Sequence, residues 1–374
     1  MNEKTVLFSE DDTLFRLMET ALNGKPSEQA VKALRYFFGD DFQKQLEYLC
    51  SLPAAVGLGS AFRARICESH DDLKILLKEA DYLVCERATI DAPLLEAGAK
   101  KLRFVQKFGS DYKNIDIKAA RELGIPVAYL RRVSTVSVAE HILALIFALS
   151  RNLIVAHHSA MSRKTAKDGL KSEGPPRTKF NWGQVPNIRL VEGKTLGLVG
   201  FGENARETAR LAHGVGMKIL YYQRHRAERE RERIVNAKYI ATLKQLVGEA
   251  DFVSIHVPYN TSTEKMFSLE ILSSMKPDSF LISGSRGGIV DETALFEVLS
   301  KNEIAGAALD VYRWEPVPSD CPLLDLKNVI WTTHNGGGAA EFLLQECHDV
   351  LENIARVERG EKPEFCIVAP KNNH

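Results

Sequence analysis

Short apolar runs alternate with helical patterns along most of the chain, and this alternation predicts an α/β fold. In the second half the runs are regularly spaced, and each has the length of a buried parallel strand. They read TLGLV, KILYY, FVSIHV, SFLIS, GAALDV and VIWTT, and they span residues 195–333. We therefore predict a doubly wound parallel sheet, of the Rossmann type, in this part of the chain.

The first part of the chain alternates less regularly. Its apolar runs are TVLFS, YLVC, FVQKF and IPVAYL, all before residue 131. Between them lie helical patterns, which predict a second, smaller parallel α/β unit. One helical pattern covers about residues 25–50, and the role of this insertion, about residues 26–51, is not readable from the sequence.

The strongest helical pattern covers Ser137 to Asn152, SVAEHILALIFALSRN. Ser137 is the expected N-cap, and Glu140 would complete a capping box. Nearly every face of this helix is apolar, so we expect it to be buried between layers or between subunits. The basic stretch at residues 157–192 contains Pro and Gly and has no regular basic face, which favours a loop or a dimer arm over a nucleic-acid site.

Charge and composition narrow the classes of partner. Of 374 residues, 45% are apolar and 26% are charged, and 49 basic residues balance 49 acidic ones. This balance predicts no nucleic-acid partner and no anionic membrane partner. We find no apolar run long enough to span a bilayer and no signal-peptide pattern at the N-terminus.

The six cysteines include no C-x-x-C pair and no zinc-ligand spacing with histidines. We therefore expect no metal site. Free thiols are typical of a reducing compartment, and the simplest prediction is a cytoplasmic protein.

The segment TLGLVGFGENARETARL contains a G-x-G-x-x-A pattern at Gly200, Gly202 and Ala205. Glycines here allow a tight turn close to a pyrophosphate, and the helix that follows directs free N–H groups at that anion. A strand before the pattern and a helix after it favour a dinucleotide-binding loop over an ordinary turn.

The end of the next strand bears on the choice of nucleotide. An acidic residue at this place usually accepts hydrogen bonds from the ribose of NAD, whereas this chain has Gln223 followed by Arg224. A neutral Gln223 would not repel a 2′-phosphate, and Arg224, with Arg226 as a second candidate, could pair with it. We predict a preference for NADP; the alternative is NAD, with Gln223 bonded to the ribose and solvated arginines.

Three polar side chains follow later strands: Arg286, Glu315 and His334. Carboxyl ends of parallel strands meet at one edge of the sheet, where such folds bind ligands. Arginine can hold a carboxylate and polarise the neighbouring carbonyl, histidine can transfer a proton, and glutamate can fix the histidine tautomer. Each alone could be an ion pair, a cap or a turn residue, but together beside a phosphate loop they predict a catalytic group.

Four segments, VSVAEHILALIFALSR, GKTLGLVGFG, SRGGIVDE and ALDVYRWEP, resemble signatures of the D-isomer-specific 2-hydroxyacid dehydrogenase family, and the resemblance runs from about Leu102 to Pro363. It implies that Arg286, Glu315 and His334 are the catalytic residues. It also implies a homodimer. For the cofactor it implies Gly200, Gly202, Val257, Pro258, Thr263, Ser285 and Asp310, with Asp310 against the nicotinamide, and these join Gln223 and Arg224, which were inferred above from the strand end.

The same resemblance implies how the chain is divided. Residues 1–133 and 334–374 would form a flavodoxin-like substrate domain, and residues 134–333 would form the inserted dinucleotide-binding domain.

The substrate loop departs from the family pattern. The glycine-rich loop of relatives reads GSDYKN here, so Ser110 and Asp111 are its candidate substrate-binding residues. Asp111 replaces a glycine, although aspartate tolerates a left-handed backbone better than most residues. Arg132 is the third candidate and could favour a substrate with a second anionic group; the alternative is an exposed arginine on a turn.

We therefore predict an NAD(P)-dependent oxidoreductase that acts on a 2-oxo acid or D-2-hydroxy acid. One alternative is a corepressor-like binding protein that senses NAD(P) without catalysis. Another is a dehydrogenase of a different small anion such as formate or phosphite. The formate branch of the family has glutamine where this chain has Glu315, which counts against formate.

Overall fold

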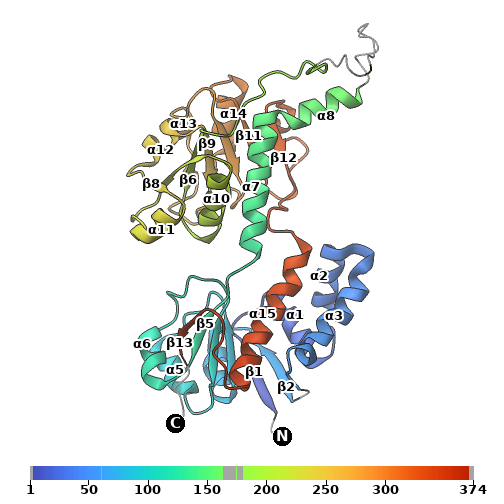
Figure 1. The fold of residues 1–374 in the computed structure, drawn as a ribbon, viewed down its shortest axis with the longest axis vertical. Helices are drawn as coiled ribbons and strands as arrows, with labels where there is room; N and C mark the ends of the chain where they lie inside the picture. The colour runs from blue at the N-terminus through green and yellow to red at the C-terminus, as the bar shows by residue number, and fades with distance from the viewer. Residues whose placement is uncertain (1–2, 60, 163–173, 175–179, 370–374) are drawn as a thin grey trace. The chain divides into compact units, whose positions relative to one another are not determined.

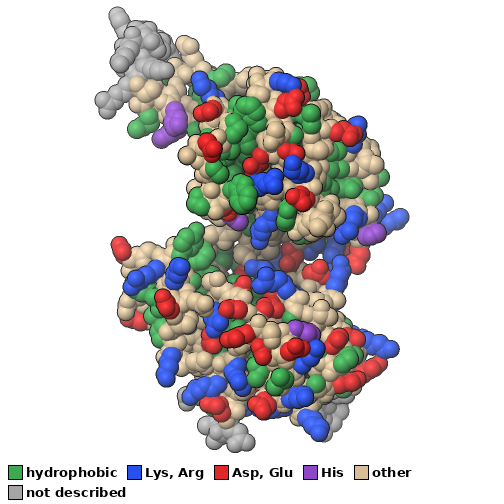
Figure 2. Space-filling model, turned by 180° about the vertical axis from the view of Figure 1, so that it is seen from behind, with side chains coloured by type: hydrophobic (Ala, Val, Ile, Leu, Met, Phe, Trp, Pro, Cys, Tyr) green, Lys and Arg blue, Asp and Glu red, His purple; other side chains and the backbone are tan. Residues whose placement is uncertain are grey.

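The computed structural model describes residues 3–59, 61–162, 174 and 180–369 of the chain. The chain is divided into two compact units. Unit 1 comprises Met1–Ser134 with Ala339–His374, and unit 2 comprises Thr135–Gly338. Each unit has its own sheet with helices on both faces (Figure 1). Acidic and basic side chains are interspersed over the face of the molecule drawn in Figure 2.

Unit 1 contains a six-stranded sheet in the order β13-β5-β4-β3-β1-β2. Its strands are β1 (Lys4–Phe8), β2 (Phe62–Ile66), β3 (Tyr82–Cys85), β4 (Phe104–Lys107), β5 (Val127–Tyr129) and β13 (Cys366–Val368). The order 2-1-3-4-5 is that of flavodoxin-like folds, and β13 adds an antiparallel edge. The predicted α/β fold class is confirmed, although β2 and β13 were not among the expected strands.

The helices of unit 1 form two layers. On one face lie α1 (Thr13–Asn23), α2 (Glu28–Phe38), α3 (Phe42–Ala55) and α15 (Ala340–Glu358), and on the other lie α4 (His70–Leu76), α5 (Ala92–Gly98) and α6 (Ile117–Leu123). Short 3-10 turns are η1 (Gly39–Asp41) and η2 (Leu77–Glu79). Strand β1 serves both layers because Val6 and Phe8 belong to one core and Leu7 to the other.

The helical pattern at residues 25–50 is two helices rather than one. Ser27 caps α2 by accepting a hydrogen bond from the N–H of Ala30, at 3.1 Å. The helix ends at Gly39, whose φ of 54° is outside the right-handed helical region. The apolar periodicity continues across this break, so periodicity alone does not reveal it.

Unit 2 contains a seven-stranded sheet in the order β12-β11-β10-β9-β6-β7-β8, with every neighbouring pair parallel. Its strands are β6 (Thr195–Val199), β7 (Lys218–Tyr222), β8 (Ala237–Tyr239), β9 (Phe252–Ile255), β10 (Phe280–Ser283), β11 (Gly306–Leu309) and β12 (Val329–Trp331). The strand order reverses between β6 and β9. This is the topological switch point at which Rossmann sheets bind ligands.

Helices cover both faces of this sheet (Figure 1). One layer contains α7 (Ser134–Arg151) and α10 (Glu203–Gly214), and the other contains α12 (Leu243–Glu249), α13 (Leu269–Leu272) and α14 (Glu292–Ser300). The remaining elements are α8 (Leu153–Met161), α11 (Arg229–Ile234) and η3 (Pro322–Asp325). Residues 163–173 and 175–179 of the predicted loop or arm lie outside the described residues.

Helix α7 begins earlier than predicted. It starts at Ser134, whose N–H donates to Glu346 Oε1 at 2.8 Å, so the acceptor at the N-terminus comes from α15. Ser137 is therefore not an N-cap; it is buried, and its Oγ donates to the carbonyl of Gly336 at 2.9 Å. By length and composition alone α7 could cross a membrane, contrary to our reading of the sequence, but core helices of soluble proteins pass the same criterion.

Candidate functional site

The turn after β6 is built for close approach of two backbones. Gly200 has a φ of 97°, and a Cβ atom there would lie 2.8 Å from the carbonyl oxygen of His256 after β9. Gly202 precedes α10, and Ala205, fully buried, packs that helix onto the core. The turn thus places the N-terminus of α10 at the switch point, where its free N–H groups can bind a phosphate.

Four more of the predicted cofactor residues follow β9 and β10, on the other side of the switch point. Val257 and Pro258 follow β9, and Thr263 fixes their loop because its Oγ donates to the Pro258 carbonyl at 2.7 Å. After β10, the Oγ of Ser285 is buried without a hydrogen-bond partner among the described residues. A buried hydroxyl without a partner fits a ligand that supplies one, so this lip is suited to a polar cofactor.

The two candidate arginines at the end of β7, Arg224 and Arg226, have different surroundings. Arg226 donates to both carboxylate oxygens of Glu232 at 2.8 Å, and this ion pair lowers the pKa of Glu232 to about 2. Arg226 is therefore already paired. Arg224 is exposed and forms no ion pair in the described part of the chain. Gln223, the residue before it, is half-buried. Of the two arginines, Arg224 is the one available to a ribose phosphate.

Glu315 and His334 lie together although 19 residues separate them. The Nδ1 atom of His334 is 2.6 Å from Glu315 Oε2, and Glu315 Oε1 accepts the N–H of Tyr312 at 3.0 Å. Burial alone would raise the pKa of Glu315, but the hydrogen bonds from His334 and from the Tyr312 N–H outweigh it and hold this pKa below its usual value. Glu315 is thus ionised at neutral pH and holds the proton on Nδ1, which leaves Nε2 of His334 for a ligand.

Arg286 follows β10, on a turn that packs against the backbone of Tyr312, and the N–H of Tyr312 donates to Glu315. A Cβ atom at Gly287 would lie 1.6 Å from the carbonyl oxygen of Tyr312, so only glycine fits there. The guanidinium of Arg286 is exposed, and it donates to the carbonyl of Ser285 at 2.7 Å. The turn of Arg286 and the residues that hold Glu315 are therefore in van der Waals contact at one edge of the sheet.

Asp310, just after β11, is 1% exposed. Its carboxylate accepts three hydrogen bonds, and His141 lies 3.4 Å from it. Its Oδ1 accepts from Thr332 Oγ and from the N–H of Asn335, and its Oδ2 accepts from the N–H of Gly336. Burial alone would raise its pKa, but these donors and His141 outweigh burial and hold the pKa far below the usual range. Asp310 is therefore a stable anion that lies against the turn containing His334.

Sequence reasoning missed His141 and Thr332. His141 Nε2 lies 3.2 Å from Thr332 Oγ and 3.4 Å from Asp310 Oδ1. A polar residue on the otherwise apolar α7 was the available signal, because a histidine on an apolar helix needs a buried partner.

The predicted substrate residues of unit 1 follow β4 and β5. Ser110 and Asp111 come after Gly109, which has a φ of 98°, and Asp111 Oδ1 accepts the N–H of Lys113 at 3.4 Å. Arg132 donates to Glu86 Oε1 at 2.8 Å and lies 4.9 Å from the centre of the Phe108 ring. Its charge is therefore balanced within unit 1.

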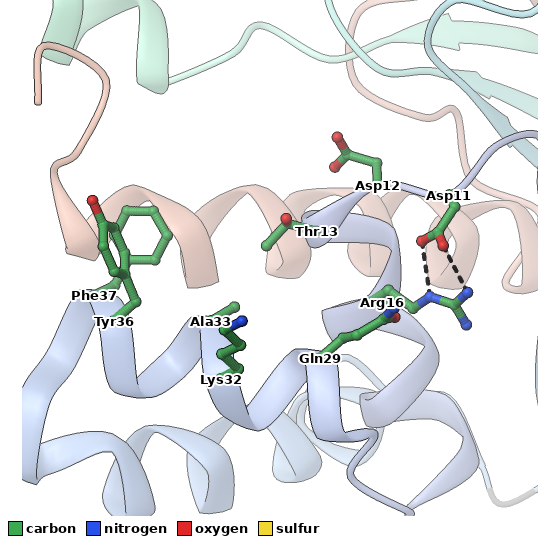
Figure 3. Close-up of a pocket in the computed structure, with 9 residues that line it drawn as sticks. All are labelled: Asp11, Asp12, Thr13, Arg16, Gln29, Lys32, Ala33, Tyr36 and Phe37. Carbon is green, nitrogen blue, oxygen red and sulfur yellow. Dashed lines mark hydrogen bonds and ion pairs between the residues drawn. The ribbon is translucent and has the colours of Figure 1, made fainter. Parts of the chain in front are cut away.

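A separate groove of about 660 Å³ lies between the start of α1 and helix α2 of the insertion (Figure 3). Arg16 crosses one end and donates to both carboxylate oxygens of Asp11, at 2.8 and 2.9 Å. Lys32 and Tyr36 line the α2 side. Among the described residues, no cluster of histidine, cysteine and carboxylate side chains could hold a metal ion.

Comparison with known proteins gives matches over most of the chain. The family described as "D-isomer specific 2-hydroxyacid dehydrogenase, NAD binding domain" matches residues 143–336. A glyoxylate reductase of Korarchaeum cryptofilum (strain OPF8) is 38% identical over 289 residues, which are 77% of this chain and 82% of that protein.

Solved structures share the fold at lower identity. D-mandelate dehydrogenase of Rhodotorula graminis is 24% identical, with a TM-score of 0.59 and coverage of 98% of this chain and 99% of that one. A formate dehydrogenase of Granulicella is also 24% identical, with a TM-score of 0.52 and coverage of 85% of each chain. Since proteins named for different substrates share this fold, the fold does not select the substrate.

Proposed function

Because the chain belongs to the D-isomer specific 2-hydroxyacid dehydrogenase family, whose members are nicotinamide-dependent oxidoreductases, we propose that it interconverts a 2-oxo acid and a D-2-hydroxy acid with NADP as the favoured cofactor. The observation that carries this proposal is the 2.6 Å hydrogen bond between His334 and Glu315, next to the turn of Arg286. These residue types match the three tasks of the reaction: binding a carboxylate, polarising a carbonyl and moving one proton.

In the reducing direction, Arg286 binds the substrate carboxylate with two parallel hydrogen bonds and polarises the adjacent carbonyl. His334, protonated, donates the proton on Nε2 to the carbonyl oxygen as it gains negative charge. Glu315 keeps the imidazole in the required orientation and favours its protonated form. The nicotinamide, when bound, supplies the hydride.

The residues at the switch point fit the cofactor. Gly200 and Gly202 leave room for the pyrophosphate, and the Oγ of Ser285 has an unused hydrogen-bonding capacity. Val257, Pro258 and Thr263 would form the wall of the groove, and Asp310 would lie by the nicotinamide. Gln223 and Arg224 would bind the ribose end.

In unit 1, Ser110 and Asp111 remain the proposed contacts of the loop with the substrate. Their loop rests on Lys107, which is buried and donates to the carbonyls of Glu86 and Phe108 at 2.6 and 2.9 Å. Arg132 is the third proposed contact. Its ion pair with Glu86 means that binding a second anionic group there requires Arg132 to exchange partners.

The decisive test is consumption of NADPH and NADH, in parallel, with glyoxylate, hydroxypyruvate, pyruvate, phenylpyruvate and 2-oxoglutarate. We expect turnover of at least one of these acids, with chiral analysis giving the D-hydroxy acid. Binding of both nucleotides without turnover of any acid would contradict the proposed activity.

The cofactor preference predicts the effect of two substitutions. Gln223→Asp would place a carboxylate beside the 2′-phosphate, and Arg224→Ala would remove its cation. Each should lower the NADPH-to-NADH ratio of kcat/KM about 10- to 100-fold, since a charged hydrogen bond is worth about 1.5–3 kcal/mol. Arg231→Ala is the control, because this exposed arginine lies on α11 and pairs with Glu228. An unchanged ratio in both variants would assign the preference to other residues.

The Glu315–His334 pair predicts a change in pH dependence. The depressed pKa of Glu315 keeps the carboxylate negative at neutral pH, where it stabilises the protonated His334 needed for reduction. In Glu315→Gln the negative charge beside His334 is lost, so the decline of the reduction rate with rising pH should begin at a lower pH than in the wild type. The measurement is kcat/KM for the oxo acid against pH. Superimposable profiles would mean that Glu315 does not act on His334.

We also propose a homodimer formed through α8 and the exposed Trp182. Leu153, Ile154 and Met161 are 48%, 48% and 68% exposed, and Trp182 is half-exposed. Apolar side chains gathered in this way usually mark an interface. Light scattering should give twice the chain mass, and Ile154→Glu should lower it toward that of one chain.

A further inference from the structure

His334 has a left-handed backbone conformation. Its φ of 56° is uncommon for residues other than glycine, although histidine, asparagine and aspartate adopt it more often than most. Such a conformation persists only where the surroundings enforce it. The surroundings of the turn at residues 332–336 therefore decide where the imidazole is held.

Asp310 fixes this turn from the side of the sheet. It accepts the N–H groups of Asn335 and Gly336, both at 3.0 Å, and the hydroxyl of Thr332 at 2.7 Å. These contacts lie on both sides of residue 334 in sequence. A single carboxylate thus holds the chain before and after the histidine.

Helix α7 also holds this turn. Ser137 Oγ donates to the carbonyl of Gly336, and His141 Nε2 contacts both Thr332 Oγ and Asp310 Oδ1. A Cβ atom at Gly336 would lie 3.0 Å from Asp310 Oδ2 and 3.2 Å from His141 Cδ2. Asp310, His141 and the turn are therefore packed against one another with little space between them.

We propose that His141 is a positioning residue for the reaction, which holds the His334 turn in its left-handed conformation through Asp310 and Thr332. The imidazole of His141 is largely buried, with 18% of its side chain exposed, and Asp310 is the carboxylate that it faces. Loss of His141 would leave Asp310 with fewer donors and free the turn to relax toward an ordinary backbone conformation. This role rests on the proposed function, because it acts through His334.

A purely structural role for His141 predicts different behaviour. In that case, loss of His141 would weaken the packing of α7 as a whole. The free energy of unfolding would fall, while the molecules that remain folded would keep their turnover. A positioning role predicts instead that kcat falls and that the loss depends on His334. It also predicts a local change at Asn335 and Gly336, whose N–H groups report on the bonds to Asp310.

The test uses His141→Leu and His141→Gln in the full-length chain. Leucine removes the polar contacts, whereas the glutamine amide can donate from a place close to that of Nε2. We expect His141→Leu to lower kcat on the order of 10-fold or more, with partial rescue in His141→Gln. His213→Leu is the matched control, since His213 is an exposed histidine on α10 of the same unit.

Two further measurements separate the outcomes. In a double-mutant cycle, His141→Leu should have little additional effect on kcat in a His334→Gln background, because both changes remove one function. Hydrogen exchange of the peptide covering residues 332–338 should be faster in His141→Leu and unchanged in the β6–β7 region. Additive effects on kcat, or unchanged exchange at 332–338, would overturn the proposal.

The exchange experiment needs no substrate, so it distinguishes two failures. If the wild type turns over no oxo acid but the exchange responds to His141, the proposed function fails and the contact between His141 and the turn stands. If the wild type is active and His141→Leu changes neither exchange nor kcat, the positioning role fails alone.

Discussion

Replacing His334 with alanine is expected to lower turnover of the oxo acid about 10³-fold, in the middle of the range for loss of a general acid. NADPH affinity should change little, because His334 follows β12 and the phosphate turn follows β6. The loss should appear in kcat rather than in nucleotide binding, since the proton is transferred only as the carbonyl is reduced. The measurements are steady-state kcat and the dissociation constant of NADPH from fluorescence.

Alanine at this place also disfavours the left-handed backbone, so a matched variant is needed. Asparagine tolerates a φ of 56° far better than alanine and cannot act as a general acid. His334→Asn should therefore lose as much activity as His334→Ala while keeping the wild-type hydrogen exchange at residues 332–338. Near wild-type turnover in His334→Asn would exclude His334 as the proton donor.

Much of unit 2 could be predicted because its signals are local. Its central strands are uninterrupted apolar runs, and the two glycines of the phosphate loop lie at one turn. The three catalytic candidates could be placed together because parallel strands end at one edge. That argument predicts a shared edge but no distance, and the contact of 2.6 Å between Glu315 and His334 required the structure.

The features that sequence reasoning missed depend on contacts between distant segments. Strand β13 has three residues and exists because Cys366 and Val368 pair with β5, more than 230 residues earlier. Ser137 resembled a helix cap because its spacing to Glu140 fits one, but Glu346 supplies the acceptor at the start of α7. Arg226 resembled a phosphate ligand until the structure placed Glu232 against it. In each case a partner outside the local pattern decided the outcome.

The second large effect is expected at Arg286. Arg286→Ala should lower kcat/KM for the oxo acid about 10³-fold, with a higher KM and a lower kcat, because one guanidinium both binds the carboxylate and polarises the carbonyl. Arg286→Lys should recover only part of this loss, since an ammonium keeps the charge but lacks the planar fork. Free guanidinium added to Arg286→Ala should restore some activity.

Arg313→Ala is the control for Arg286, because Arg313 is an exposed arginine on the neighbouring turn and its N–H binds Glu292. Arg313→Ala should remain near wild-type activity.

The Arg286 variants also test how the site is built. Gly287 lets the Arg286 turn touch the backbone of Tyr312, whose N–H holds Glu315, so the anion-binding and proton-transfer residues share one support. If Arg286→Ala raised KM without lowering kcat, Arg286 would bind substrate and transition state equally, and polarisation of the carbonyl would have to come from another group.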